Sequence, residues 1–117
     1  FDGTDGCTLP ENTVYQLENG DVLYNIPTDI AGLQWDIEGT FATGATGGEA
    51  VAAGFVMSAA GNGTILGFSF TGAVITTDCG ILINTPLDNY ATFTGLGGLT
   101  FSDSNATEIP VTYHVND

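Results

Sequence analysis

The sequence contains no lysine and no arginine, against 14 aspartate and glutamate residues, and its formal net charge is −14. Without a basic patch or an arginine fork, we expect no binding to nucleic acid or to phosphate groups. Schiff-base chemistry and P-loop phosphate binding are excluded as well, because both use a lysine. Anionic membrane surfaces would repel a chain of this charge.

Long apolar runs are also missing. No stretch approaches the roughly 18 consecutive apolar residues of a membrane span, so no direct membrane insertion is expected. Charged residues form only 12% of the chain and hydrophobic residues 43%, which is typical of a folded protein rather than an acidic disordered tail. We therefore predict one core and a single domain over residues 1–117. The chain begins at Phe1 rather than Met, which indicates a mature or excised segment.

The abundant residues are glycine, with 17 copies, and threonine, and both indicate short strands joined by tight turns. The clearest hairpin surrounds Asn19-Gly20, the dipeptide that a two-residue type I′ turn prefers. Residues Glu49–Ala53 could instead start a helical turn before Gly54. About nine short strands and no convincing helix predict an all-β fold, an antiparallel β-sandwich or jelly roll. The predicted strands cover residues 13–17, 21–25, 29–38, 55–58, 64–71, 74–77, 79–84, 90–94, 99–102 and 109–115.

The two cysteines, Cys7 and Cys79, are an even pair in a small chain without lysine. We predict a disulfide between them and hence an oxidising, extracellular location, with two buried free thiols as the alternative. Closing a loop of this length should stabilise the fold by about 4 kcal/mol in the chain-entropy model. Asn62 and Asn105 each start a glycosylation sequon, which fits the same compartment.

Three phrases of the sequence carry a resemblance to a known family: TDIAGLQWDI at 28–37, GTILGFSF at 63–70 and LTFSDSNATEIPV at 99–111. In this family an early strand reads GxQFDI, and the last hairpin reads FSDxxGxxIPVT. The chain resembles a cohesin-type β-sandwich module over most of residues 21–113. The resemblance implies a β-sandwich with a non-catalytic binding or scaffolding role, as in modules of large secreted and cell-surface proteins.

No pattern in the sequence indicates an enzyme. His114, the only histidine, is predicted to be an exposed residue of the last strand, and no Gly-x-Ser-x-Gly elbow accompanies it. Asp36 and Glu38 are two residues apart on one polar strand face, whereas a glycosidase needs two carboxyls facing each other across a cleft. We therefore interpret this pair as part of a solvated face and expect no catalytic residues.

Calcium is the one metal that the sequence suggests. Asp2-Gly3-Thr4-Asp5-Gly6 places two carboxylates among flexible glycines, and Asp103 begins a second acidic turn. Calcium loops use oxygen ligands at such near-alternate positions. The alternative is turn chemistry, in which Asp and Asn side chains bind their own backbone. No cofactor is required by either interpretation.

These observations predict a secreted structural or interaction module of a cell-surface or fibre-forming assembly. Its partners would be other protein modules or copies of itself. Residues 1–12 would serve as an exchanged or tethering strand, since they carry little secondary-structure signal of their own. The alternative is a carbohydrate-binding module whose exposed aromatic rings stack on sugars. The candidate rings are Tyr15, Tyr24, Phe41, Tyr90 and Phe93.

Overall fold

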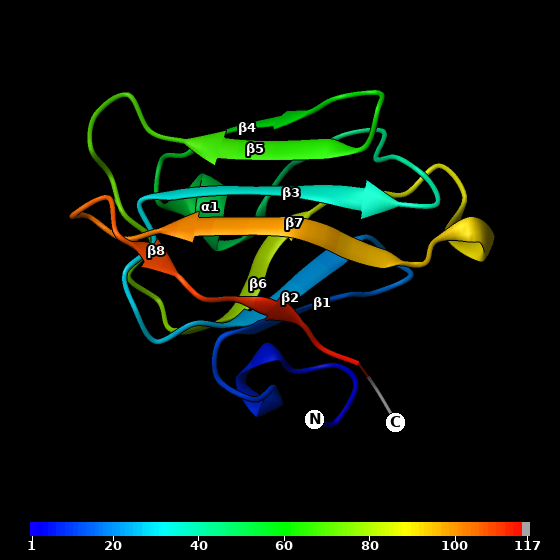
Figure 1. Cartoon of the computed structure of the whole chain (residues 1–117), viewed down its shortest axis with the longest axis horizontal. Helices are drawn as coiled ribbons and strands as arrows, with labels where there is room; N and C mark the ends of the chain where they lie inside the picture. The colour runs from blue at the N-terminus through cyan, green and yellow to red at the C-terminus, as the bar shows by residue number, and fades with distance from the viewer. Residues whose placement is uncertain (116–117) are drawn as a thin grey trace.

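The structure is a computed structural model and describes residues 1–115. Two sheets pack face to face, one with strand order β6-β2-β1-β9 and the other with order β4-β5-β3-β7-β8 (Figure 1). All strand pairs are antiparallel except β1 and β9, which are parallel. The predicted all-β sandwich is confirmed. The strands are β1 (Thr13–Gln16), β2 (Asp21–Asn25), β3 (Gly32–Glu38), β4 (Val56–Ala59), β5 (Thr64–Phe68), β6 (Cys79–Asn84), β7 (Gly95–Ser102), β8 (Glu108–Ile109) and β9 (Thr112–Tyr113).

Three short helical segments accompany the sheets: η1 (Gly6–Thr8), α1 (Gly48–Ala52) and η2 (Tyr90–Thr92). The helical turn that the sequence allowed around Glu49 is α1. Among residues 1–115 no helix has the length and apolarity to cross a membrane.

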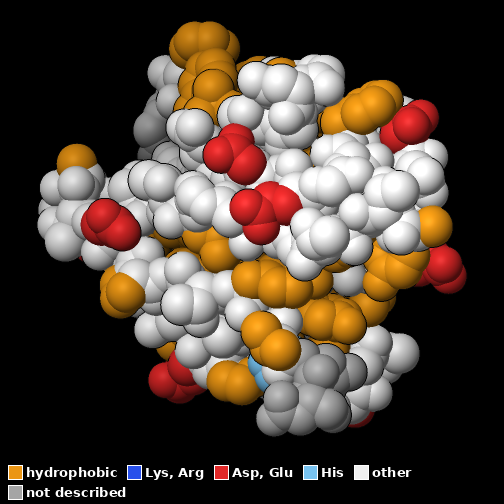
Figure 2. Space-filling model, turned by 45° about the vertical axis from the view of Figure 1, so that its right-hand side comes forward, with side chains coloured by type: hydrophobic (Ala, Val, Ile, Leu, Met, Phe, Trp, Pro, Cys, Tyr) orange, Lys and Arg blue, Asp and Glu red, His pale blue; other side chains and the backbone are white. Residues whose placement is uncertain are grey.

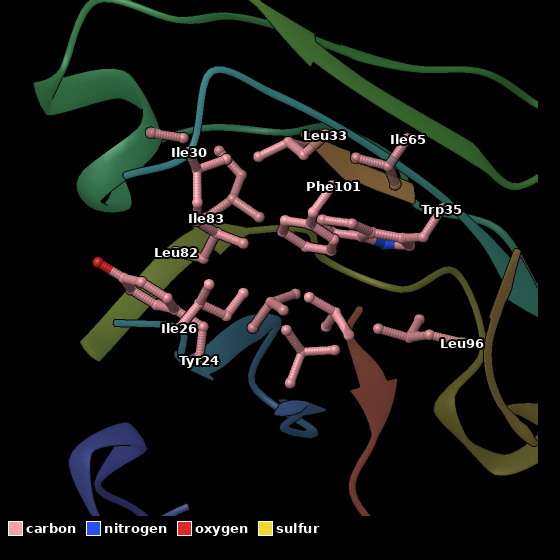
Figure 3. Packing of buried hydrophobic residues seen from close by; sticks show 14 of the residues in the cluster. Tyr24, Ile26, Ile30, Leu33, Trp35, Ile65, Leu82, Ile83, Leu96 and Phe101 are labelled. Carbon is pink, nitrogen blue, oxygen red and sulfur yellow. The ribbon is translucent and has the colours of Figure 1, made fainter. Parts of the chain in front are cut away.

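The core lies between the two sheets and follows from alternation along the strands. In β3 the side chains of Leu33, Trp35 and Ile37 are buried, while those between them are exposed. Trp35 stacks on Phe101 of the neighbouring β7, with ring centroids 5.9 Å apart and 15° between the planes (Figure 3). Burying two large aromatic side chains makes this pair a main contributor to the hydrophobic stabilisation of the fold.

Three predicted strands do not form as single strands, and others, such as those at 29–38 and 64–71, differ only in where they begin or end. Residues 74–77 form no strand, because Ile75 satisfies its backbone through a single bridge to Ile30. Residues 90–94 were predicted as extended, but they contain η2, whose N-terminus is capped by the Asn89 side chain accepting from the Ala91 N–H at 3.1 Å. The predicted strand at 109–115 is divided into β8 and β9 around Pro110, which has no N–H to donate to a ladder.

The turn at Asn19-Gly20 is not of type I′, which would need positive φ at both residues. Only Gly20 has positive φ, 101°. Its N–H donates to the Leu17 carbonyl at 3.1 Å, and the Leu17 N–H donates to the Asp21 carbonyl at 2.8 Å. This is a three-residue loop ending in a glycine bulge, and the Asn19 side chain holds it by accepting from the Asp21 N–H at 2.9 Å.

The same hydrogen-bond pattern recurs in the β4–β5 turn, which ends at Gly63, and in the β7–β8 turn, which ends at Ala106. Gly63 has a φ of 98° and Ala106 a φ of 62°. An alanine in this left-handed region is strained, because its Cβ crowds the following carbonyl.

The N-terminal segment is held to the four-stranded sheet by the predicted disulfide, Cys7–Cys79, which is confirmed. Residues 1–12 contain η1 rather than a β-strand. Leu9 is buried, its carbonyl accepts from the Asn25 amide at 2.8 Å, and the Asn12 N–H donates to the Asn25 carbonyl at 2.6 Å. The segment is therefore held to the sheet without forming a strand of its own, and its use as an exchanged or tethering strand stays a prediction.

Candidate functional site

Aromatic rings from β1, β9 and η2 lie in contact with one another. Tyr15 of β1 stacks on Tyr113 of the adjacent β9, with centroids 5.7 Å apart and 19° between the planes. Phe93 meets Tyr113 edge-on at 6.3 Å and stacks on Tyr90 at 5.7 Å. Figure 2 shows apolar side chains gathered on this side of the molecule, beside the histidine in pale blue. We call this group the aromatic cluster: Phe1, Tyr15, Tyr90, Phe93, Tyr113 and His114.

His114 belongs to the aromatic cluster, so the prediction of an exposed strand residue was wrong. Its ring is half-buried and lies edge-on to Phe1 at 5.3 Å and to Tyr15 at 5.9 Å. The cause is that pairing with β1 continues beyond β9, since the His114 N–H donates to the Val14 carbonyl at 2.9 Å. Val115, the next residue, is 74% exposed.

The hydroxyl oxygen of Tyr113, a member of the aromatic cluster, accepts a hydrogen bond from the Gln16 backbone N–H at 3.4 Å. Burial raises the pKa of Tyr113 to about 12. The phenol is therefore neutral at physiological pH. The cluster thus combines flat ring faces with a neutral hydroxyl, which is the chemistry that sugar rings and uncharged ligands recognise.

Three of the five predicted aromatic candidates come together in this cluster, and two do not. Tyr24 is fully buried, and its hydroxyl donates to the Thr77 carbonyl at 2.7 Å. Burial also raises the pKa of Tyr24. Phe41 is 37% exposed but makes none of the ring contacts of the cluster. Sequence reasoning missed Phe1 and Tyr113, since their place depends on the parallel pairing of the first and last strands.

Asp36 and Glu38 lie on the outer, solvent-facing side of β3, as predicted. The positions beside them on the flanking strands are Thr64, Gly97 and Gly95. The Thr64 hydroxyl donates to the Asp36 carboxylate at 2.8 Å. The flanking strands thus place no carboxylate opposite either residue, which is the arrangement that a glycosidase would need.

The calcium candidates act as turn-forming residues. One carboxylate oxygen of Asp2 accepts from the backbone N–H groups of Thr4 and Asp5, both at 2.8 Å. These backbone hydrogen bonds lower the pKa of Asp2. One oxygen of Asp103 accepts in the same way from Asn105 and Thr107, both at 2.9 Å. Within the described part of the chain, no three His, Cys, Asp or Glu side chains form a group that could hold a metal ion.

Asp5 accepts from the Cys7 N–H at 2.9 Å and so caps η1. It belongs to the N-terminal segment together with Asp2, while Asp103 begins the β7–β8 turn, so the two candidate calcium positions lie in separate turns, and calcium binding at either one stays a prediction. Both sequon asparagines are exposed in hairpin turns, Asn62 between β4 and β5 and Asn105 between β7 and β8. Glycosylation at these positions stays a prediction.

A small pocket of about 170 Å³ lies between α1 and the segment that precedes β6. Glu49 on its wall accepts from the Thr77 hydroxyl at 3.1 Å, and the hydroxyls of Thr77 and Tyr24 lie 2.6 Å apart. Typical ligand pockets measure about 300–1,000 Å³. This pocket is therefore too small to bury an ordinary organic ligand.

The second notable surface lies on a part of the chain that has no acidic residues. From Ala50 to Thr77 the sequence contains no Asp and no Glu. This stretch includes β4 and β5, which form the upper edge of the molecule in Figure 1, and apolar side chains stand at that edge in Figure 2. Val56 is 44% exposed, Leu66 40% and Phe70 83%. We call these three side chains, together with the exposed Ser58 that lies opposite Leu66 on β4, the neutral surface.

The fold and its surfaces define the chain as a strongly acidic, disulfide-bonded β-sandwich with a half-buried aromatic cluster and an exposed neutral surface. No protein-family model matches the chain, and no curated protein matches it.

Proposed function

We propose that the chain is a non-catalytic interaction module of an extracellular or cell-surface assembly and binds another protein through the neutral surface. The carboxylate-free stretch carries this proposal, because the other parts of the chain hold all 14 acidic residues. The disulfide supports an extracellular place, since disulfides persist in oxidising compartments. The cohesin-like phrases of the sequence favour the same class of role.

Salt screening explains why the local absence of carboxylates matters more than the net charge. At physiological ionic strength the Debye length is about 8 Å. The shortest extent of the molecule is 22 Å, so carboxylates on distant faces are screened from a partner that docks at one edge. Only carboxylates at the contact itself would have to lose water, and β4 and β5 carry none.

The test is photo-crosslinking in the organism's own assembly. A photoreactive amino acid replaces Leu66 in the neutral surface, and a matched variant carries it at Gln34, which is exposed on the same sheet face directly beside Leu66 in register. Because β3 lies one strand further from the edge, we expect a discrete protein adduct from position 66 and much less from position 34. Equal labelling at both positions, or no protein adduct at position 66, would contradict the proposal.

The aromatic cluster supports a second candidate function, carbohydrate binding. Tyr90 is 37% exposed and stacks on Phe93, so its ring is held while part of its surface stays open to a ligand. Base and sugar rings stack on such preformed aromatic surfaces with little loss of side-chain entropy. This candidate depends on the cluster alone and is independent of the neutral surface.

Affinity electrophoresis on a panel of polysaccharides tests the carbohydrate candidate. Tyr90→Ala should abolish any retardation of the chain. Phe41→Ala is the matched control, since Phe41 has the same exposed fraction, 37%, but lies outside the aromatic cluster. No retardation of the unmodified chain on any polysaccharide, or equal loss in both variants, would exclude the cluster as a sugar site.

A further inference from the structure

We infer that β4 pairs with β4 of a second copy of this chain, antiparallel about a two-fold axis, so that the two five-stranded sheets become one continuous sheet. The inference rests on the proposed function, because it names the partner of the neutral surface. It follows from three features of β4: an unprotected edge, a self-complementary set of backbone groups and an absence of charge.

The first feature is the unprotected edge. β4 pairs with β5 on one side only, in a register that runs from Val56 to Ala59 without a bulge. Figure 1 shows no other segment beyond β4 at the top of the molecule. Proteins blunt such edges with charges, prolines, bulges or covering segments, because an open edge is a template for pairing with another strand. The sequence of β4, Val-Met-Ser-Ala, contains neither a charge nor a proline.

The other three sheet edges are protected in these ways. β8 carries Glu108 and is followed by Pro110. β9 has only two residues. β6 is covered near its end by Thr46, which exchanges backbone hydrogen bonds with Asn84 at 2.9 and 2.8 Å. β4 is thus the edge at which the described fold leaves room for another strand.

The second feature is the set of backbone groups that β4 presents. The Ala60 N–H donates to the Thr64 carbonyl at 2.9 Å, so Ala60 and Thr64 are a hydrogen-bonded pair of the β4–β5 ladder. Hydrogen-bonded and non-hydrogen-bonded pairs alternate along an antiparallel ladder. The N–H and C=O groups of Met57 and Ala59 therefore point away from β5, toward the open edge.

These groups complement themselves. If a two-fold axis passes beside Ser58, Met57 of one copy lies opposite Ala59 of the other, and the reverse pair lies on the opposite side of the axis. Each of the two pairs exchanges two backbone hydrogen bonds, as in any antiparallel ladder. The Ser58 side chains of the two copies then face each other on the outer surface. Such an isologous contact closes as a dimer and does not propagate into a fibre.

The third feature, charge, favours a second copy over a different protein. A cationic partner would be attracted to the carboxylates that cover the rest of the chain, and the neutral surface would offer it nothing. A second copy brings the same charge of −14 and can approach closely only where neither copy has carboxylates. The β4–β5 edge meets this condition on both sides of the contact.

Sedimentation velocity on the purified chain tests the inference, from about 1 μM to about 1 mM protein and in about 0.15 M and 1 M NaCl. We expect a reversible monomer–dimer equilibrium that tightens at high salt. Ser58→Glu places two carboxylates opposite each other, and Ala59→Pro removes an outward N–H from each copy. Each variant should weaken the dimer at least about tenfold. Gln34→Glu, with the same added charge at an exposed position on β3, should leave the dimer unchanged.

The outcomes separate this inference from the proposed function. A monomer at every concentration and salt, or a dimer that Ala59→Pro leaves intact, overturns β4 pairing. If position 66 then still crosslinks to a different protein in the assembly, the interaction module stands and only its partner changes. Near-ultraviolet circular dichroism of each variant confirms that the sandwich is folded, and Ser58→Glu provides a second reading because it alters only an exposed side chain.

Discussion

Removal of the Cys7–Cys79 disulfide gives the sharpest test of how this sequence maintains its fold. The bond joins residues separated by 72 positions, so it removes a large amount of conformational freedom from the unfolded chain. In the chain-entropy model a loop of this length corresponds to about 4 kcal/mol. Losing this much stability corresponds to a decrease of about 15 °C in the melting temperature of a domain of this size. The whole free energy of unfolding of a small domain is only about 5–15 kcal/mol.

The structure determines how much of that loss should be observed. If the N-terminal segment came loose in the reduced native state, the native chain would regain entropy and the loss would shrink. Leu9 is buried, however, and the Asn25 side chain and backbone hold Leu9 and Asn12. Only the first few residues are then free to move in the reduced native state. We therefore expect the free energy of unfolding to fall by most of the 4 kcal/mol when the disulfide is removed.

Urea denaturation of three samples measures this effect: the oxidised chain, the chain reduced with a phosphine, and the Cys7→Ala/Cys79→Ala variant. The reductant can reach the bond, since Cys7 is exposed. Reduced and variant proteins should be destabilised equally. A loss below about 1 kcal/mol in both would refute the reasoning, because the loop-closure term would then be absent. Hydrogen exchange should show faster opening of β2 as well as of residues 1–12.

Four further predictions follow from the packing, the backbone and the pKa values. Phe101→Ala should lower the free energy of unfolding by about 3–5 kcal/mol in urea melts followed by tryptophan fluorescence. Gly6→Ala, whose added Cβ would meet a backbone carbonyl of β6, should destabilise by about 1–3 kcal/mol, and Gly61→Ala, with open space, by much less. Ala106→Gly should raise the melting temperature, since it relieves about 1 kcal/mol of left-handed strain. The raised pKa of Tyr113 should make stability fall as pH rises from 10 toward about 12, because the unfolded phenol loses its proton first; Tyr113→Phe should weaken this dependence, and Tyr24, whose pKa burial also raises, should account for what remains.

Much of the sandwich could be predicted because its causes are local. Alternation of apolar and polar residues places Leu33, Trp35 and Ile37 on one face of β3 without reference to any other strand. The same reasoning failed at residues 90–94, where the Asn89 cap competes with extended structure and wins. It failed at Asn19-Gly20 for a similar reason, since the asparagine side chain stabilises a longer loop than the dipeptide usually forms.

The candidate surfaces were predicted less well, since they depend on which strands become neighbours. Tyr15 and Tyr113 meet only because β1 and β9 pair in parallel, and no local pattern specifies that pairing. The neutral surface was visible in the sequence as a stretch without Asp or Glu from Ala50 to Thr77. Its meaning was not visible, because the sequence does not show that β4 lies at a sheet edge.

The sequence by itself determined the electrostatic character of this protein, the all-β class and the identity of the disulfide partners, as there are only two cysteines to pair. These properties follow from composition and from periodicity along a single strand. Only the tertiary structure decided that three sheet edges are protected and one is open, and that His114 joins an aromatic cluster with Phe1. Edges and clusters arise from contacts between residues far apart in the chain, and these contacts are fixed by the packing of the two sheets as a whole.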